Sequence, residues 1–362
     1  MYQASELELN KLLAVVLERE ASDLHLTGGE PPVVRIDGNL FKLEEYEPLT
    51  IDAIKSLLDV MLNPAQRELL EKKQDLDFAY SYKDNVRFRV NAFKQKGQLA
   101  AAFRLIPSRI KTVEELALPA SLLDLCQKKQ GLVLMVGPTG HGKSTALAAM
   151  IDHINQTRSE HILTIEDPVE FVFTPDKSII SQRELYIDTP DFAQALRSSL
   201  REDCNVIFVG EMRDLESIQT VMTIAETGHL VFATLHTNDA AQTIDRIVDV
   251  FPSYQQQQIR SQLANVLLGI VSLRLLPKVG GGRIPAAEII LSNSAVRNIV
   301  REGKTYELDN VVHTSAEMGM VALDKALALL VARGAVAIED AMAYVKDVEY
   351  FKSLVSSSQN AV

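Results

Sequence analysis

A glycine-rich run over residues 137–145 lies between an apolar stretch typical of a buried strand (132–136) and one typical of a helix (146–151). The run matches G-x-x-x-x-G-K-[ST] and consists of Gly137, Pro138, Thr139, Gly140, His141, Gly142, Lys143, Ser144 and Thr145. Glycines let the backbone N–H groups surround phosphate oxygens, and the helix directs its positive end at the same point. The run therefore predicts a P-loop for a nucleoside triphosphate, with Lys143 on the β/γ-phosphates and the Ser144 hydroxyl on Mg²⁺.

The pattern after the P-loop predicts an α/β domain with a mainly parallel sheet. Apolar stretches at 132–136, 161–166, 206–210 and 230–235 alternate with helical patterns. The residues before it mix helical periodicity at 5–20, 50–60 and 64–73 with a hairpin at 33–40 and alternating strands at 86–90 and 101–104. The expected boundaries are an α+β domain over 1–105, a linker over 106–120, the α/β domain with a C-terminal helical part over 121–350, and a flexible tail over 351–362.

Charge and cysteine content narrow the class of protein. The sequence has 37 Lys and Arg against 48 Asp and Glu, a net charge of −11, which argues against holding nucleic acid by charge. Cys126 and Cys204 are the only cysteines, too few for a zinc tetrad or a disulfide framework, which fits a reducing compartment. No signal peptide is evident, and the most apolar stretch, 263–276, is too short and polar to span a bilayer. A cytoplasmic protein is expected.

Carboxylates follow two of the predicted strands. Glu166 ends the strand at 161–166, Glu170 lies just beyond it, and Glu211 follows the strand at 206–210. Ligands of open α/β sheets bind beyond the carboxyl ends of strands. We therefore expect Glu166 and Glu170 to support Mg²⁺ or its waters, and Glu211 to orient or activate the attacking water. The alternative is that such carboxylates face solvent or cap a turn.

The histidines and arginines indicate a role at the phosphate site less clearly than the carboxylates do. His229 and His236 flank the strand at 230–235, where a metal site lacks a third ligand. A structural role and, for His236, a role in sensing the γ-phosphate remain equally open from the residues alone. Arg87, Arg89 and Arg104 lie on predicted strands; a solvated basic face is favoured, and an arginine finger is the alternative.

Taken together, these stretches resemble the secretion and pilus motor ATPases of the RecA-like superfamily, and among them the PilT/PilU retraction ATPases of type IV pili. The likeness is carried by an Asp box at 161–171, a Walker B region at 200–216, a His box at 226–237, a further stretch at 243–252, a PAS-like N-terminal domain with motifs at 23–26 and 32–38, and a retraction motif at 295–302.

The resemblance implies a fold, a ligand and partners. It implies a homohexamer that binds ATP and Mg²⁺ between the PAS-like and RecA-like domains, in the cytoplasm at the inner-membrane base of the pilus. The partners implied are an inner-membrane platform protein and a paralogous retraction ATPase, and no nucleic acid. Glu211 would be the catalytic glutamate, Glu166 would hold Mg²⁺ through water, and Glu170 would support it. Arg104, Arg87 and Arg89 would approach the phosphates, while His229 and His236 would couple the phosphate state to movement.

Some features separate the alternatives within this superfamily. Assembly and type II secretion ATPases usually carry a four-cysteine zinc insertion, and residues 273–289 contain no cysteine. That absence and the motif at 295–302 favour retraction. His141 stands where these proteins usually have a small residue, which leaves a PilT-like motor and a PilU-like accessory subunit both open. A nucleic-acid translocase is disfavoured by the acidic balance.

Overall fold

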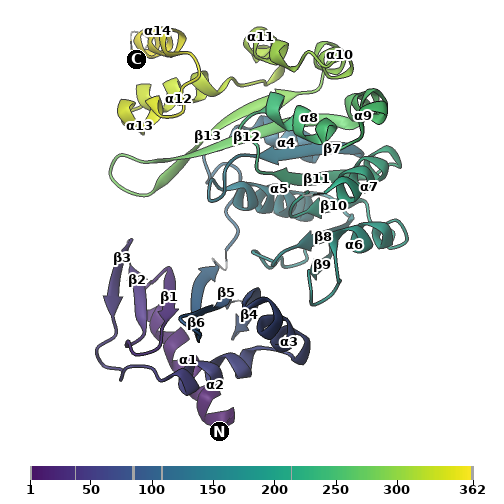
Figure 1. Cartoon of the computed structure of the whole chain (residues 1–362). Coiled ribbons are helices and arrows are strands. Elements are labelled where there is room, and N and C mark those ends of the chain that lie inside the picture. The colour runs from purple at the N-terminus through teal and green to yellow at the C-terminus, as the bar shows by residue number, and fades with distance from the viewer. Residues whose placement is uncertain (1, 37, 84–85, 107–108, 213, 360–362) are drawn as a thin grey trace. The chain divides into compact units, whose positions relative to one another are not determined.

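The chain forms two compact units in the computed structural model, which describes residues 2–36, 38–83, 86–106, 109–212 and 214–359 (Figure 1). The first unit comprises Met1–Arg109 together with Asp167–Val172, and the second comprises Ile110–Glu166 and Phe173–Val362. The division at Arg109 falls inside the predicted linker, of which residues 107–108 lie outside the described residues. The segment Asp167–Val172 follows a strand of the second unit yet packs with the first.

The first unit is an antiparallel sheet of six strands with three helices, so the predicted α+β character is confirmed. The strand order is β3-β2-β1-β6-β5-β4. Its elements are α1 (Tyr2–Glu18), β1 (Asp23–Leu26), β2 (Val33–Ile36), β3 (Asn39–Lys42), α2 (Ile51–Met61), α3 (Pro64–Lys73), β4 (Asp75–Tyr82), β5 (Val86–Gln95) and β6 (Gln98–Ile106). Apolar residues of the helices, such as Leu12 and Leu57, share one core with Phe88 and Phe103 of the sheet.

The two faces of this sheet differ in chemistry because side chains alternate along a strand. On β5, Phe88 and Val90 are fully buried in the core, so Arg87 and Arg89 lie on the other face. Arg104 of β6 pairs directly with Arg89 and therefore shares that face. The predicted arginines thus form a row on the polar side of the first unit.

The second unit is built on a sheet of seven strands in the order β13-β12-β7-β11-β10-β8-β9. Every neighbouring pair is parallel except β12 and β13, which confirms the predicted α/β domain. Its strands are β7 (Gly131–Val136), β8 (His161–Glu166), β9 (Ile179–Glu184), β10 (Val206–Val209), β11 (Leu230–Leu235), β12 (Leu267–Pro277) and β13 (Arg283–Leu291). Its helices are α4 (Ser121–Cys126), α5 (Lys143–Thr157), α6 (Phe192–Ser199), α7 (Leu215–Glu226), α8 (Ala240–Asp249), α9 (Ser253–Val266), α10 (Ser294–Glu302), α11 (Leu308–Thr314), α12 (Leu323–Ala332), α13 (Ile338–Met342) and α14 (Val348–Gln359), with short 3₁₀ turns η1 (Thr305–Glu307) and η2 (Ala316–Met318).

Helices α5, α6, α7 and α8 contact the strands of this sheet, and the central strands are buried on both faces (Figure 1). Every residue of β7 and of β11 is buried. Strands covered on both faces read as continuous apolar runs, which is why these strands could be predicted from sequence. Edge strand β9 carries partly exposed polar residues and was not predicted.

The apolar stretch at 263–276 is the end of α9 followed by β12, the neighbour of β7 in the sheet. Its hydrophobicity therefore reflects burial inside the second unit. Gly280, Gly281 and Gly282 form the turn between β12 and β13 with φ values of 87°, 104° and 78°, a backbone conformation that glycine adopts readily. In the part of the chain that the structure describes, no helix is long and apolar enough to cross a membrane.

The prediction of a flexible tail over 351–362 is wrong for residues 351–359, which belong to helix α14. Phe351 is 0% exposed and packs in a core shared with Leu327 of α12. Val355, one helical turn later, extends the same apolar face, while Ser356 and Ser357 are exposed. The serines thus occupy the solvent side of an anchored helix. Residues 360–362 lie outside the described residues.

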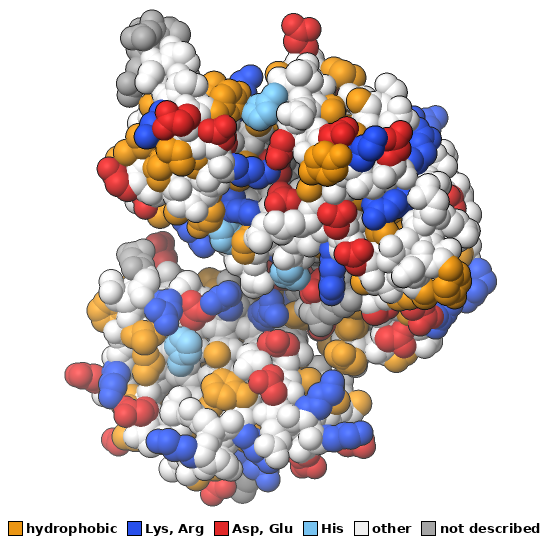
Figure 2. All heavy atoms as spheres, turned by 45° about the horizontal axis from the view of Figure 1, so that its top comes forward, with side chains coloured by type: hydrophobic (Ala, Val, Ile, Leu, Met, Phe, Trp, Pro, Cys, Tyr) orange, Lys and Arg blue, Asp and Glu red, His pale blue; other side chains and the backbone are white. Residues whose placement is uncertain are grey.

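Both charge signs are distributed over the face of the molecule drawn in Figure 2, where Lys and Arg side chains alternate with Asp and Glu.

The two cysteines should be unreactive in the folded protein. Burial raises the pKa of Cys126 to about 12 and that of Cys204 to about 11. Because the thiolate is the nucleophile, we expect both to react with an aromatic disulfide reagent at least about 100-fold more slowly in the native chain than in guanidinium chloride near pH 8. The measurement is thiol release followed by absorbance. Fast native reaction of either thiol would contradict the burial described.

Candidate active site

The P-loop connects β7 to α5 at the centre of the parallel sheet. Lys143 opens helix α5, and its N-cap Gly142 adopts the left-handed conformation at φ 84°. The Lys143 side chain is buried at 7% exposure, and its Nζ donates to Gly137 O at 2.7 Å and Pro138 O at 2.9 Å. An ammonium group, a helix N-terminus and a glycine-rich loop thus meet at one place, which is the donor set that binds phosphate.

Gly137 is required by a close approach of two backbones. Its φ is 138°, and a Cβ at this position would lie 2.6 Å from Leu273 O of β12. Gly140 and Gly142 also have positive φ, yet a Cβ on either would meet no heavy atom within 4 Å. The loop is therefore tightly seated against β12 at its start and open at its tip.

His236 lies between the P-loop and Glu211. Its Nδ1 is 3.4 Å from Lys143 Nζ and 3.2 Å from Thr139 Oγ1, and its Nε2 is 3.4 Å from Glu211 Oε1. Strand β11, which ends just before His236, is flanked by β7 and β10, so the three strand ends deliver the lysine, the histidine and the glutamate to one edge. The structure thus brings together three residues that the sequence had singled out separately.

Glu166 ends β8, the neighbour of β10, on the same edge of the sheet. It is 5% exposed, and its Oε1 accepts hydrogen bonds from Thr164 Oγ1 at 2.7 Å and Gln182 Nε2 at 3.4 Å. Neither donor was predicted. Thr164 could have been found because it lies two residues before Glu166, on the same face of the strand. Gln182 could not, because it lies on the unpredicted strand β9.

Glu170 and the predicted arginines lie in the first unit. Arg89 Nη1 is 3.3 Å from Glu170 Oε1, and its Nη2 is 3.6 Å from Asp77 Oδ2. Arg104 Nε donates to Asp23 Oδ1 at 2.9 Å, while its side chain remains 73% exposed. Both arginines therefore have carboxylate partners within their own unit, and Arg104 keeps most of its side chain accessible.

His229 is not brought to the P-loop. It precedes β11, so it lies at the amino end of the strand whose carboxyl end carries His236, roughly 20 Å away at the usual rise of a strand. Its Nδ1 is 3.2 Å from Ile224 O and 3.2 Å from Thr227 Oγ1, at the end of α7. His229 therefore contacts the end of α7, and its role in coupling the phosphate state to movement stays a prediction.

His141 turns away from the tip of the P-loop toward β12. Its Nδ1 accepts a hydrogen bond from the Leu275 backbone N–H at 3.1 Å. Burial lowers the pKa of His141 below its usual 6.5, and the nearby cations Arg274, Lys143 and Arg283 lower it further. The imidazole is therefore neutral near pH 7 and adds bulk, but no charge, beside the phosphate site.

The residues present fit a nucleotide with Mg²⁺. Hard oxygen donors stand at the same edge: the Ser144 hydroxyl at the start of α5 and the carboxylates of Glu166 and Glu211. Among the described residues, no group of three or more His, Cys, Asp or Glu side chains could hold a metal alone. This donor set suits Mg²⁺, which characteristically takes one or two protein ligands and completes its shell with phosphate and water.

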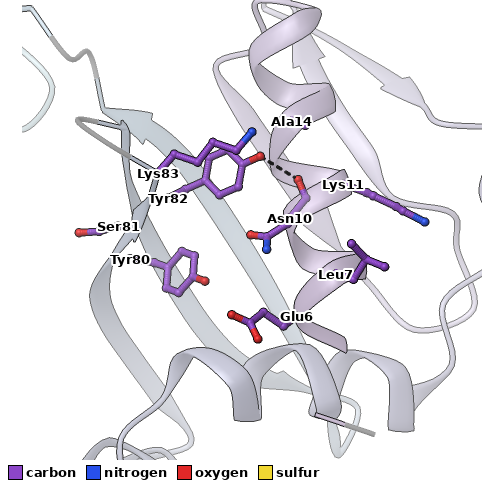
Figure 3. Close-up of a pocket in the computed structure, with 9 residues that line it drawn as sticks. All are labelled: Glu6, Leu7, Asn10, Lys11, Ala14, Tyr80, Ser81, Tyr82 and Lys83. Carbon is purple, nitrogen blue, oxygen red and sulfur yellow. Dashed lines mark hydrogen bonds between the residues drawn. The ribbon is translucent and has the colours of Figure 1, made fainter. Parts of the chain in front are cut away.

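A separate pocket of about 480 Å³ lies within the first unit, between α1 and the edge strand β4 (Figure 3). Tyr82 donates its hydroxyl proton to Asn10 O at 3.2 Å, and Lys83 Nζ lies 5.0 Å from the Tyr82 ring centre. Figure 3 shows Glu6 and Tyr80 facing each other across it. None of the residues predicted to bind nucleotide lines this pocket.

Comparison with known proteins shows the family that this chain resembles along most of its length. The model of the type II/IV secretion system protein family matches residues 3–338. The chain is 45% identical to the type IV pilus retraction ATPase PilT of Pseudomonas aeruginosa, over 95% of this chain and 100% of that protein. It is 36% identical to the type IV pilus ATPase PilU of the same organism, over 96% and 91%. A crystal structure of the pilus retraction motor PilT with bound ADP superposes with a TM-score of 0.87 at 47% identity, covering 95% of this chain and 98% of that one.

Proposed function

The chain belongs to the type II/IV secretion system protein family, and from that premise we propose that it is an ATPase that drives the retraction of type IV pili. Its RecA-like domain carries the ATP site and the smaller N-terminal domain assists it. The observation that carries the proposal is the position of His236 between Lys143 of the P-loop and Glu211. This arrangement links the group that holds the phosphates to the group that acts on the water.

In the proposed reaction each residue has one task. Lys143 and the N–H groups of the P-loop hold the β- and γ-phosphates, and Glu211 orients the attacking water and accepts its proton. His236 touches both residues and so can report the presence of the γ-phosphate to the loop that follows β11. Bound Mg²⁺, held by Ser144 and through water by Glu166, would neutralise charge on the phosphate oxygens.

The first unit contributes arginines in this proposal. Arg104, with its side chain 73% exposed, is the candidate for reaching phosphate oxygens, assisted by Arg87 and Arg89. Glu170 is proposed to hold Arg89 in position, since the two are 3.3 Å apart. The role of Glu170 is then to orient a cation, and it supports the metal only indirectly.

Assembly and partners extend the proposal. Six copies would form a ring, and ATP-driven motion within it would act on an inner-membrane platform protein at the cytoplasmic base of the pilus. A paralogous ATPase is a further proposed partner. The higher identity to PilT than to PilU, 45% against 36%, favours the motor over the accessory role. His229, at the far end of β11, is proposed to couple through the end of α7, which its ring contacts.

Hydrolysis of ATP and molar mass test the proposal together. We expect Mg²⁺-dependent hydrolysis by a particle of six times the chain mass, measured by phosphate release and light scattering. Lys143→Ala should lose it, because the buried ammonium that holds the phosphates is removed. Lys129→Ala, which changes an exposed lysine just before β7, should not. A ring that binds ATP but turns over no faster than Lys143→Ala would instead support a PilU-like accessory subunit.

A cellular assay tests whether the protein drives retraction or assembly of the pilus. Expression in a piliated strain that lacks its own retraction ATPase should restore surface movement, and Lys143→Ala should not. Restored pilus assembly in an assembly-deficient strain, without effect on retraction, would overturn the proposal in favour of an assembly motor.

A further inference from the structure

Strand β12 extends past the strand that carries the P-loop. β7 ends at Val136, which pairs with Ser272, while β12 continues along β13 to Pro277. Leu273 O faces the start of the P-loop. In a strand the backbone N–H and C=O groups of every second residue point to the same side. Leu275 therefore directs its N–H toward the P-loop, beyond the last residue of β7.

The His141 imidazole provides the acceptor that β7 no longer supplies there. Its Nδ1 accepts the Leu275 N–H at 3.1 Å. Leu275 is half-buried, and this bond gives its N–H a partner and ties residue 141 of the P-loop to β12. A serine or alanine at 141 is too short to reach the same N–H.

The other side of the same ring meets the C-terminal helices. The centres of the His141 and Tyr344 rings are 6.0 Å apart at 80°, an edge-to-face contact. The Arg274 guanidinium lies 6.0 Å from the Tyr344 ring centre and donates to Asn238 O at 2.7 Å, in the loop that follows His236. Tyr344 is thus in contact with both phosphate-site loops, directly through His141 and through Arg274.

The segment that carries Tyr344 is firmly attached to the helices around it. The backbone N–H groups of Lys346 and Asp347 both donate to Asp324 of α12, each at 2.9 Å. Lys346 Nζ donates to Glu288 of β13 at 2.8 Å. A displacement of Tyr344 is therefore passed to α12 through Asp324, while Lys346 ties the same segment to β13.

We propose that His141 is a positioning residue that couples nucleotide occupancy of the P-loop to the C-terminal helices α12–α14 through Tyr344. The inference rests on the proposed binding of ATP at this loop. Because the backbone of residue 141 belongs to the loop that surrounds the phosphates, any adjustment of the loop on binding moves the ring against Tyr344.

A fluorescent probe at Tyr344 tests the coupling directly. The chain contains no tryptophan, so the indole introduced by Tyr344→Trp reports alone. Mg²⁺ with ADP or a non-hydrolysable ATP analogue should change its emission, and adding His141→Ala should reduce that change at least about threefold at equal occupancy. Occupancy is set by calorimetry. Tyr306→Trp, at a position that is 73% exposed in η1, is the matched control and should show no response.

Two variants at 141 separate the hydrogen bond from the ring contact. His141→Ala should raise the KM for ATP about fivefold, more than it lowers kcat, because the loop loses its tie to Leu275. His141→Asn retains an acceptor at the position of Nδ1 and should restore the KM, but it lacks the ring and should not restore the fluorescence response.

The outcomes distinguish this inference from the proposed function. An emission change that persists undiminished in Tyr344→Trp/His141→Ala overturns the coupling, and so does a silent Tyr344→Trp probe in a chain that binds nucleotide. Absence of nucleotide binding to the native chain by calorimetry overturns the proposed function, and the inference falls with it.

Discussion

Replacing Glu211 with glutamine should lower the rate of ATP hydrolysis at least about 100-fold while ATP binding stays within about threefold. Glu211 follows the buried strand β10, and its Oε1 lies 3.4 Å from His236 Nε2. Glutamine keeps the size of the side chain and one oxygen, but it cannot accept a proton from water. The loss should therefore fall on kcat, measured by phosphate release, with the dissociation constant of ATP measured by calorimetry.

Glu216→Gln is the matched control for this change. Glu216 lies in the first turn of helix α7, is 61% exposed, and pairs with Arg197 on the surface. A surface ion pair of this kind contributes little, so the control should hydrolyse ATP at the native rate. If Glu211→Gln remained active while Glu166→Gln lost turnover, the base would have to be reassigned to the carboxylate that Thr164 and Gln182 orient.

The site was predictable to the extent that it depends on strand ends. In a parallel sheet the carboxyl ends of all strands lie on one edge, so a P-loop after one strand places the acids and histidines after its neighbours nearby. Glu211, Glu166 and His236 each follow a strand that is apolar enough to recognise. The same rule places His229 away from the phosphate site, because His229 precedes its strand and so lies at the amino end.

The remaining features depend on contacts between residues far apart in the chain. Gln182 lies on an edge strand whose mixed polarity hides it, and Tyr344 reaches His141 only through the fold of the C-terminal helices. No local pattern marks either residue. The prediction of a flexible tail was wrong for a related reason. The end of the chain is rich in serine, yet Phe351 and Val355 on one helical face anchor α14.

Replacing Gly137 with alanine should cost about 2–5 kcal/mol of folding free energy and weaken ATP binding at least about tenfold. A methyl group there would lie 2.6 Å from Leu273 O, and Arg274 Nη1 would be 3.5 Å away. The blocking atom belongs to the backbone of β12, which pairs with β13 at Leu273 and with β7 up to Ser272, so it cannot rotate away. Either β7 separates from β12, or the start of the P-loop moves and carries its N–H groups out of register with the phosphates.

Gly140→Ala separates this steric effect from backbone strain. Gly140 also has a positive φ, of 80°, but a Cβ there would meet no heavy atom within 4 Å, so only the conformational cost of about 1–2 kcal/mol applies. Urea unfolding followed by circular dichroism and calorimetric ATP titration should therefore rank the variants native, Gly140→Ala, Gly137→Ala. Equal losses in the two variants would mean that φ alone sets the requirement for glycine. The greater loss at Gly137 would show that the seating of the loop against β12 holds the phosphate cradle in shape, which is also the contact on which the tie between His141 and Leu275 depends.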